Sequence, residues 1–243
     1  MSSESILFTA NEDLAAPLFQ FDAVKKTGLL HLPLETYEYY PEPEEGAVIQ
    51  DKLDDFAFVV HANLRNARYF LQWVEERHLL KQVQQRVNLA ADEPTAVFLE
   101  DKEIPAILPR KDAKPIDVLE FLLRISRDGS TLYPTTDQKT GEIPGLLQEL
   151  EMPVNEFTIC RETSVPPVKL EKYRKRVISA DVKSVLFHNR TSILRIRKAF
   201  PELDLSSIQR IAGSKGVAEK LKEEGLEADV QAHGSWASIA GVL

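Results

Sequence analysis

The chain has 243 residues, of which 43% are apolar and 28% are charged, and its formal net charge at pH 7 is -8. This length is enough for one large domain or two small ones with a real hydrophobic core. The acidic balance disfavours nonspecific nucleic-acid binding, which needs a positive face, but a local site for a small anionic ligand remains compatible with it.

Cysteine use and the lack of long apolar segments bear on location. The single cysteine, Cys160, excludes an intramolecular disulfide framework and favours a reducing cytoplasm. Because the five histidines are scattered, no metal site is expected. No apolar run approaches a membrane span, and the start "MSSESILFTANED" has neither a basic stretch nor a long apolar segment. We therefore expect a cytoplasmic protein without signal peptide, membrane partner or nucleic-acid partner.

The beginning of the chain predicts one strand, one helix and an extended exit. Residues 5–9, "SILFT", predict a buried strand, and Asn11 or Asp13 is placed to cap a helix over 14–28, which ends in glycine. The stretch 29–45 alternates apolar and polar residues before two prolines and several glutamates. This pattern indicates an extended strand that leaves one body for another.

The middle of the chain predicts a second body of alternating helices and strands. Asn63 precedes apolar residues at helical spacing, and Pro94 opens another helix at its first turn. Asp112 or Lys114-Pro115 begins a later helix, and Gly129 ends the connection after it. The expected helices are 46–56, 63–79, 94–103, 116–126 and 141–152, and the expected strands are 57–61, 83–89, 106–108 and 130–136.

The last third predicts a return to the first body. Residues 155–167 form an extended return path that ends in two prolines. The remaining elements are helices over 169–179, 190–203, 215–226 and 235–243 and strands over 183–188, 207–213 and 227–232.

This alternation predicts the α/β class: two similar α/β lobes with mostly parallel sheets and right-handed crossovers, joined by a two-stranded linker. Lobe 1 is expected to be discontinuous, with residues 1–36 plus 166–243. Lobe 2 is expected to span 42–157, and the linker strands 37–41 and 158–165.

One short cluster occurs twice. "DDFAFVVHANLR" begins at Asp54 and "DVKSVLFHNRTS" at Asp181, and each runs from an acid through an apolar strand to His, Asn and Arg. The elements after each copy follow in the same order, which fits two copies of one α/β unit. Open parallel sheets bind ligands beyond the carboxyl ends of their strands, where helix N-termini favour anions. The candidate anion-binding residues there are His61, Asn63, Arg65, His188, Asn189 and Arg190.

Other interpretations of these residues remain open at this point. Asn63 could serve only as a helix cap, and the arginines could be solvated helix residues. The histidines could satisfy local backbone groups, and shared ancestry of the two halves would produce the repeat without any ligand.

Two more turns are expected at the same kind of edge. One contains Gly213, Ser214, Lys215 and Gly216 and suits either an anion cradle or a plain tight turn, since it lacks the spacing of a P-loop or a dinucleotide fingerprint. The other is either a ligand-binding edge or a polar loop, and it contains Tyr133, Thr135, Thr136 and Lys139.

Common catalytic motifs are missing from the sequence. There is no G-x-S-x-G elbow and no H-E-x-x-H, and Cys160 has no obvious base partner. This fits an enzyme without a cofactor whose work is mostly positioning, and it fits a binding protein equally.

The order of segments over essentially the whole chain resembles the uroporphyrinogen-III synthase family. The resemblance rests on "LPLETYEYYP" as the outgoing linker and on the two strand-helix segments that contain His61 and His188. It also rests on "TLYPTTDQKTGEIPGLLQELEMPVNEFTICRETSVPP", which resembles a strand, a helix and the returning linker. The last part is the C-terminal block, "RIAGSKGVAEKLKEEGLEADVQAHGSWASIAGVL". The segments "EIPGLL" and "AFPEL" resemble those of family members from the Bacteroidetes branch.

The chain also departs from the family pattern. Cys160 and Arg161 stand where the family often has a tyrosine, which is a proposed proton donor, and His61 and His188 with their neighbours replace the usual Thr-Ser. The usual threonine of the last turn falls near Lys215 or Gly216.

The resemblance implies a function and a set of ligand contacts. The family cyclises hydroxymethylbilane to uroporphyrinogen III in heme biosynthesis, with loss of water and inversion of the last pyrrole ring, as a lyase without a cofactor. It implies a monomer that binds a linear tetrapyrrole, and it adds Thr9 and Arg161 to the substrate-binding candidates above. No catalytic residue is assigned, with Tyr133, His61 and His188 as candidate acids. The alternative is a noncatalytic two-lobed binding protein for an anionic small ligand.

Overall fold

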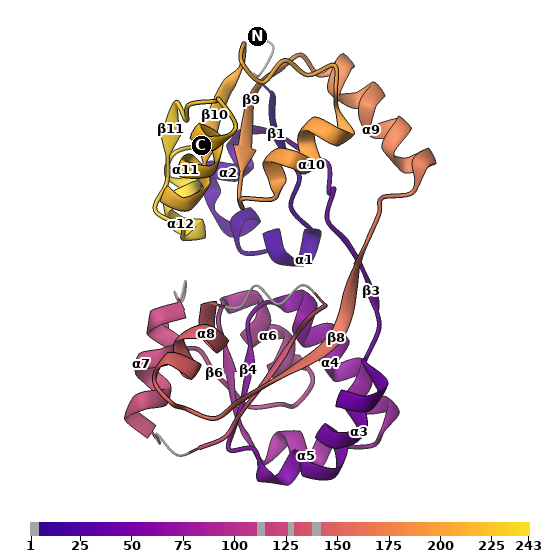
Figure 1. Ribbon diagram of the computed structural model, residues 1–243, viewed down its shortest axis with the longest axis vertical. Helices are drawn as coiled ribbons and strands as arrows, with labels where there is room; N and C mark the ends of the chain where they lie inside the picture. Colours follow the sequence, from indigo (N-terminus) through magenta and orange to yellow (C-terminus); the bar gives the residue numbers. More distant parts are fainter. Residues whose placement is uncertain (1–4, 111–114, 126–128, 138–141) are drawn as a thin grey trace. The chain divides into compact units, whose positions relative to one another are not determined.

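The computed structural model describes residues 5–110, 115–125, 129–137 and 142–243 (Figure 1). The chain divides into two compact units: unit 1 is Met1–Thr36 with Thr163–Leu243, and unit 2 is Tyr37–Glu162. Unit 1 is therefore assembled from two separate stretches of the sequence, and unit 2 from one continuous stretch.

Unit 1 is built on a five-stranded sheet with the order β11-β10-β9-β1-β2, in which neighbouring strands are parallel. Parallel neighbours need crossover connections, which the helices supply. The strands are β1 (Ser5–Phe8), β2 (Gly28–His31), β9 (Val182–Phe187), β10 (Gln209–Ala212) and β11 (Val230–Gln231). The helices are α1 (Glu12–Ala15), η1 (Leu18–Gln20, a 3-10 turn), α2 (Asp22–Lys26), α9 (Pro167–Ser179), α10 (Ser192–Ala199), α11 (Lys215–Glu223) and α12 (Trp236–Ala240).

Unit 2 contains a six-stranded sheet with the order β3-β8-β7-β4-β5-β6, and the pairs from β8 to β6 are parallel. Its strands are β3 (Thr36–Tyr39), β4 (Phe58–His61), β5 (Val87–Ala90), β6 (Ala106–Ile107), β7 (Thr131–Thr136) and β8 (Val154–Thr163). Its helices are α3 (Pro43–Lys52), η2 (Leu53–Asp55, a 3-10 turn), α4 (Leu64–Glu76), α5 (Leu80–Gln84), α6 (Glu93–Asp101), α7 (Pro115–Ile125) and α8 (Glu142–Glu149).

The two sheets repeat one strand order. Strands β9, β10 and β11 of unit 1 correspond to β4, β5 and β6 of unit 2, and β1 and β2 correspond to β7 and β8. In each sheet the direction of winding reverses between two central strands, which are β1 and β9 in unit 1 and β7 and β4 in unit 2. Ligands of open α/β sheets bind at such switch points. The predicted class, two similar and mostly parallel α/β lobes, is confirmed.

The chain crosses between the units within β3 and β8, which are neighbours in the sheet of unit 2. The Tyr40 N–H donates to the carbonyl of Ile159 at 2.9 Å. The Thr36 hydroxyl donates to the carbonyl of Thr163 at 2.5 Å, on the unit 1 side of both crossings. The two crossing segments are thus joined to each other, as a two-stranded linker requires. The bounds predicted for the linker and the lobes stay a prediction.

Each sheet buries apolar side chains on both faces, because successive strand residues point to opposite sides. In β9, Phe187 belongs to one core cluster and Leu186 to another. In β4, Val59 and Val60 divide in the same way. All four side chains are fully buried. The sequences of these strands are therefore continuous apolar runs, which is typical of parallel sheets covered on both faces.

Three expected elements differ from the structure. The single helix over 14–28 is wrong: Asn11 caps α1 by accepting from the Asp13 and Leu14 N–H groups, but the helix ends before Pro17, whose ring cannot continue it. Gly28 begins β2 instead of ending a helix.

The segment 29–45 is not one outgoing strand, since β2 pairs with β1 in register Leu7 to Leu30. The strand expected over 83–89 is wrong in its first half, where α5 ends at Gln84. The predictions for Asp112, Lys114 and Lys139 lie outside the described residues.

Gly129 offers a stability test of the core of unit 2. A Cβ atom there would lie 2.4 Å from Cε2 of Phe58. A Cβ atom on Gly145 in α8 would have no neighbouring side-chain or backbone atom within 4 Å. We expect Gly129→Ala to lower the free energy of unfolding by about 1–3 kcal/mol through overpacking. Gly145→Ala should raise it by about 0.5–1 kcal/mol through helix propensity. Urea unfolding measures both, and a Gly129→Ala protein as stable as the original would contradict the packing described.

Candidate functional site

The switch point of unit 1 is covered by the segment that follows β2. The Leu32 N–H donates to the Phe8 carbonyl at 2.8 Å, and the Leu34 N–H donates to the Thr9 carbonyl at 2.9 Å. This segment thus continues alongside the end of β1 and brings Glu35 to the carboxyl ends of β1 and β9. The Asn11 side chain, which also caps α1, donates to the Glu35 carbonyl at 3.3 Å and holds the backbone there.

The Glu35 carboxylate lies among three donors from the other side of the switch point. Nε2 of His188 donates to its Oε1 at 2.9 Å, and Nδ2 of Asn189 donates to the same oxygen at 2.7 Å. The Arg195 guanidinium, from α10, donates to it as well and forms an ion pair. Glu35 is 1% exposed. A buried carboxylate is stable only when it is paired and hydrogen-bonded, and this one meets both conditions.

The electrostatics of this cluster keep Glu35 ionised. Burial by itself raises the pKa of the carboxyl group, but the charge and hydrogen bond of His188, the charge of Arg195 and the bond from Asn189 outweigh it and lower the pKa to about 2. Because the folded pKa lies below the ordinary value of 4.5, the contribution to stability is present above pH 4.5 and is lost as the pH falls toward 2.

The switch point of unit 2 presents an arginine instead of a carboxylate. Asn63 caps α4, since its Oδ1 accepts the Asn66 N–H at 3.0 Å, and Nδ2 of Asn66 donates to the Pro134 carbonyl in β7 at 3.1 Å. The Oδ1 atom of Asn66 accepts from Nε of Arg65 at 3.0 Å. The Arg65 guanidinium lies over the ring of Tyr37, 3.8 Å from its centroid. These contacts hold a cation at the junction of β4 and β7.

Cys160 lies beside that arginine on β8 and is buried. Burial raises the pKa of its thiol to about 11, against a lowering effect of Arg65. A thiol with such a pKa is protonated at neutral pH and is a weak nucleophile. The structure thus agrees with the absence of a thiol mechanism.

His61 points into the core of unit 2. It is 0% exposed, its Nε2 lies 3.2 Å from Oδ1 of Asn88, and its ring contacts Phe70 at a centroid distance of 5.6 Å. Burial lowers its pKa to about 4, opposed by the weaker effect of Asn88, so the ring is neutral at pH 7. The structure therefore places this candidate at a strand end, as expected, but in a setting that suits a neutral core histidine.

The remaining candidates divide by exposure. Three candidates are buried at strand ends: Thr9 directly after β1, and Thr135 and Thr136 at the end of β7. Tyr133 is also buried, but it lies within β7 and packs in a core cluster of unit 2, so the expectation that it stands at the strand end is wrong. Three cationic candidates are mostly in solvent, with side chains 47%, 60% and 82% exposed for Arg161, Arg190 and Lys215, and each lies near an acid: Glu38, Glu223 and Glu219 respectively.

The turn after β10 is explained by local structure. Ser214 caps α11 through the Val217 N–H, and a Cβ on Gly213 would lie 3.1 Å from the carbonyl oxygen of Phe187. A Cβ on Gly216 would meet no atom within 4 Å. The tight-turn interpretation accounts for this segment.

Sequence reasoning missed the partners that define both switch points. These residues are Glu35, Arg195, Tyr37, Asn66 and Asn88. One signal was available: Glu35 stands in the apolar stretch "LHLPLETY", and an acid there needs a buried partner. The partnership with His188, more than 150 positions away, depends on the sheet order and could not be read locally.

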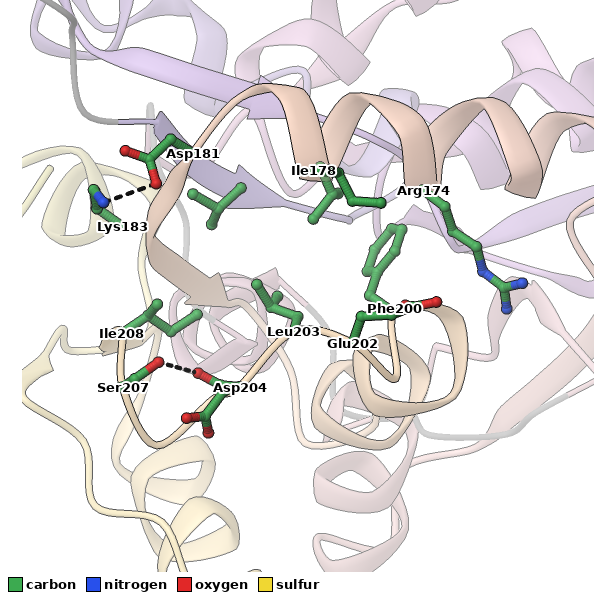
Figure 2. Close-up of a pocket in the computed structure, with 12 residues that line it drawn as sticks. Arg174, Ile178, Asp181, Lys183, Phe200, Glu202, Leu203, Asp204, Ser207 and Ile208 are labelled. Carbon is green, nitrogen blue, oxygen red and sulfur yellow. Dashed lines mark hydrogen bonds and ion pairs between the residues drawn. The ribbon is translucent and has the colours of Figure 1, made fainter.

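A pocket of unit 1 lies away from the switch point of that unit (Figure 2). It has a volume of about 400 Å³ and is formed by α9, the start of β9 and the segment between α10 and β10. Its charged lining residues are Arg174, Asp181, Lys183, Glu202 and Asp204. Lys183 is paired with Asp181 at 2.8 Å, and acids outnumber bases. The pocket is at the amino end of β9, so it is not the predicted anion site.

None of the helices among the described residues is both long and apolar enough to cross a membrane. No group of three or more His, Cys, Asp or Glu side chains among those residues is arranged to hold a metal ion.

Comparisons with known proteins show which solved structures share this fold. No protein-family model matches the sequence, and no curated protein matches it. The structure is similar to the uroporphyrinogen-III synthetase of Helicobacter pylori, with a TM-score of 0.64 and 16% identity over 98% of this chain and 97% of that one. It is also similar to a mutant uroporphyrinogen III synthase of Thermus thermophilus, with a TM-score of 0.55 and 12% identity over 98% and 97% of the chains. The chain therefore has the two-lobed fold of these synthases.

The buried imidazole of His61 predicts an acid-sensitive unit 2. Its pKa of about 4 lies below the ordinary value of 6.5, so His61 contributes stability that is complete above pH 6.5 and is lost as the pH falls toward 4. The loss amounts to about 3 kcal/mol. We expect His61→Gln to flatten the dependence of stability on pH in this window.

The matched control is His78→Asn, because His78 is exposed in the same unit and asparagine tolerates its φ of 57°. Urea unfolding at pH 7, 6, 5 and 4 makes the comparison. Equal slopes for His61→Gln and the original protein would refute the assignment.

Proposed function

We propose that this chain is a uroporphyrinogen-III synthase, which closes hydroxymethylbilane into uroporphyrinogen III without a cofactor. The reaction breaks the bond to the terminal hydroxyl, which leaves as water, and the electrophilic end is then attacked through a spiro intermediate that inverts the last pyrrole ring. The substrate is flexible, so the enzyme must select the attacking carbon. Holding the chain in one conformation can account for several kcal/mol of the barrier.

The observation that carries the proposal is the likeness of fold over 98% of this chain to two proteins described as uroporphyrinogen III synthases. A shared fold does not imply a shared function, so the proposal also needs a site. The switch point of unit 2 supports it, since a cation stands there at the carboxyl edge of a parallel sheet, where such folds bind ligands.

Arg65 is the best-placed group for a substrate carboxylate. A guanidinium has five N–H donors, and the contacts described use Nε for Asn66, one bond for Cys160 and the flat face for Tyr37. The stacked, bonded side chain is 7% exposed and is already fixed in place. Charge-assisted hydrogen bonds from a fixed arginine to a carboxylate are strong and specific in direction.

The two candidate imidazoles are poor sources of a proton. His61 is neutral at pH 7 and enclosed, and the Nε2 proton of His188 is engaged by Glu35. Tyr133 is buried within β7, in a core cluster of unit 2. The geometry supports a mechanism that depends on positioning and on anion binding more than on acid catalysis by either histidine.

A noncatalytic two-lobed protein for an anionic small ligand is the second candidate. The departure at Cys160, where the family often has a tyrosine, favours it, because the phenol that is the family's proposed proton donor is missing there and the thiol in its place is buried. The same anion-binding groups would then serve binding alone. In either case we expect a cytoplasmic monomer.

Product analysis separates the two. Purified protein is incubated with freshly prepared hydroxymethylbilane, and the products are oxidised and separated into isomers I and III. Spontaneous closure gives isomer I, so isomer III above the protein-free control is expected for a synthase. If only isomer I forms while hydroxymethylbilane still binds, the protein is a noncatalytic binding protein.

Arg65→Met tests the anion contact. We expect it to weaken substrate binding or raise KM about 10–100-fold, which corresponds to the loss of one or two charge-assisted hydrogen bonds. Arg68→Met is the matched control, since it removes the same charge from an exposed position of the same helix. Equal effects of the two substitutions, by calorimetry or by isomer III kinetics, would remove Arg65 from the site.

A further inference from the structure

The donors around Glu35 are held by contacts that do not involve Glu35. Oδ1 of Asn189 accepts the Ser192 N–H at 2.8 Å, and the Ser192 hydroxyl donates to the Asn189 carbonyl at 2.6 Å. The His188 ring packs edge-on against Phe8 at a centroid distance of 5.6 Å. Arg195 belongs to the regular helix α10. His188, Asn189 and Arg195 thus form a preorganised set of donors that converge on one oxygen.

The acceptor comes from a different part of the chain. Glu35 lies between β2 and β3, outside any helix or strand, and one residue before the unit boundary at Thr36. Its side chain is 2% exposed and that of His188 is 3% exposed. The carboxylate therefore occupies the position at the switch point where an anionic ligand would meet these donors. The arrangement is that of a protein anion site with a bound carboxylate, except that the carboxylate belongs to the same chain.

We propose that His188, Asn189 and Arg195 form a carboxylate-binding site whose resident ligand is the side chain of Glu35. The anion position of unit 1 is therefore satisfied from within the chain, whereas the corresponding position of unit 2 presents Arg65. A linear substrate with several carboxylates is then held at unit 2 and at exposed cations, not by the His-Asn pair of unit 1. The assignment of Glu35 as the resident ligand uses contacts of unit 1 alone, and only the statement about the substrate rests on the proposed function.

Chemical rescue tests the site. Glu35→Ala should remove the acceptor that the three donors share and lower the unfolding temperature by on the order of 10 °C, as loss of one partner of a buried pair does. Sodium formate or acetate should then restore part of the loss in a saturable manner. Equal concentrations of sodium chloride should not, and the original protein should show no specific response, because its site is filled.

Glu45→Ala serves as the matched control in unit 2. The Glu45 carboxylate accepts the Thr158 N–H at 2.7 Å, so its removal also leaves a donor without its acceptor. That donor is a backbone N–H, whereas Glu35 accepts from three side chains. Formate should not rescue this variant. A Glu35→Ala protein that responds to formate no more than to chloride, or no more than Glu45→Ala does, overturns the proposal.

A double-mutant cycle covers the case in which Glu35→Ala does not fold. Glu35→Gln keeps the shape of the side chain and removes its charge, and Arg195→Met keeps the length of the arginine stem. If the carboxylate is the ligand of Arg195, Arg195→Met costs less stability in the Glu35→Gln background than in the original protein. An equal cost in both backgrounds overturns the proposal. Isomer analysis is not involved, so failure here leaves the proposed reaction to its own test.

Discussion

The placement of the described candidate residues depends on one constraint, the parallel pairing of strands in a repeated order. Parallel strands bring all their carboxyl ends to one edge, and the reversal of winding separates the connections at β1 and β9 in unit 1 and at β7 and β4 in unit 2. Residues that follow these strands are brought together whatever their distance in sequence. For this reason a short His-Asn-Arg pattern at two strand ends predicts where these residues lie, independently of any ligand.

The two switch points have diverged in charge although their strand order is the same. In unit 1 a buried carboxylate is matched by one guanidinium and two hydrogen-bond donors. In unit 2 the histidine is a neutral core residue, and the cation is Arg65, fixed by Asn66 and Tyr37. A common ancestor of the halves explains the similar sequence, whereas the different surroundings explain why equivalent residues have different roles.

The sequence was sufficient for the fold and insufficient for the chemistry of the site. Apolar runs, Asn63 as a cap and the helix that Pro94 opens were predicted because they depend on neighbours along the chain. Pro17 was overlooked as a breaker, and the helical turn at Leu80–Gln84 was taken for strand. The role of Glu35 could not be predicted, because its three partners follow β9, about 150 residues later, and are known only once β1 lies beside β9. Long-range partners of buried charges are the information that local patterns lack.

The discontinuity of unit 1 has a consequence for synthesis on the ribosome. Unit 2 is a continuous stretch, Tyr37–Glu162, and its whole sheet apart from the first residue of β3 and the last of β8 is available once that stretch has emerged. In unit 1, β1 emerges first but is a central strand whose partner β9 begins only at Val182. The nascent chain must therefore carry an apolar strand with one unsatisfied edge throughout translation of the intervening lobe. The order of synthesis and the order of folding therefore differ here: the inserted lobe can form ahead of the lobe whose first strand precedes it.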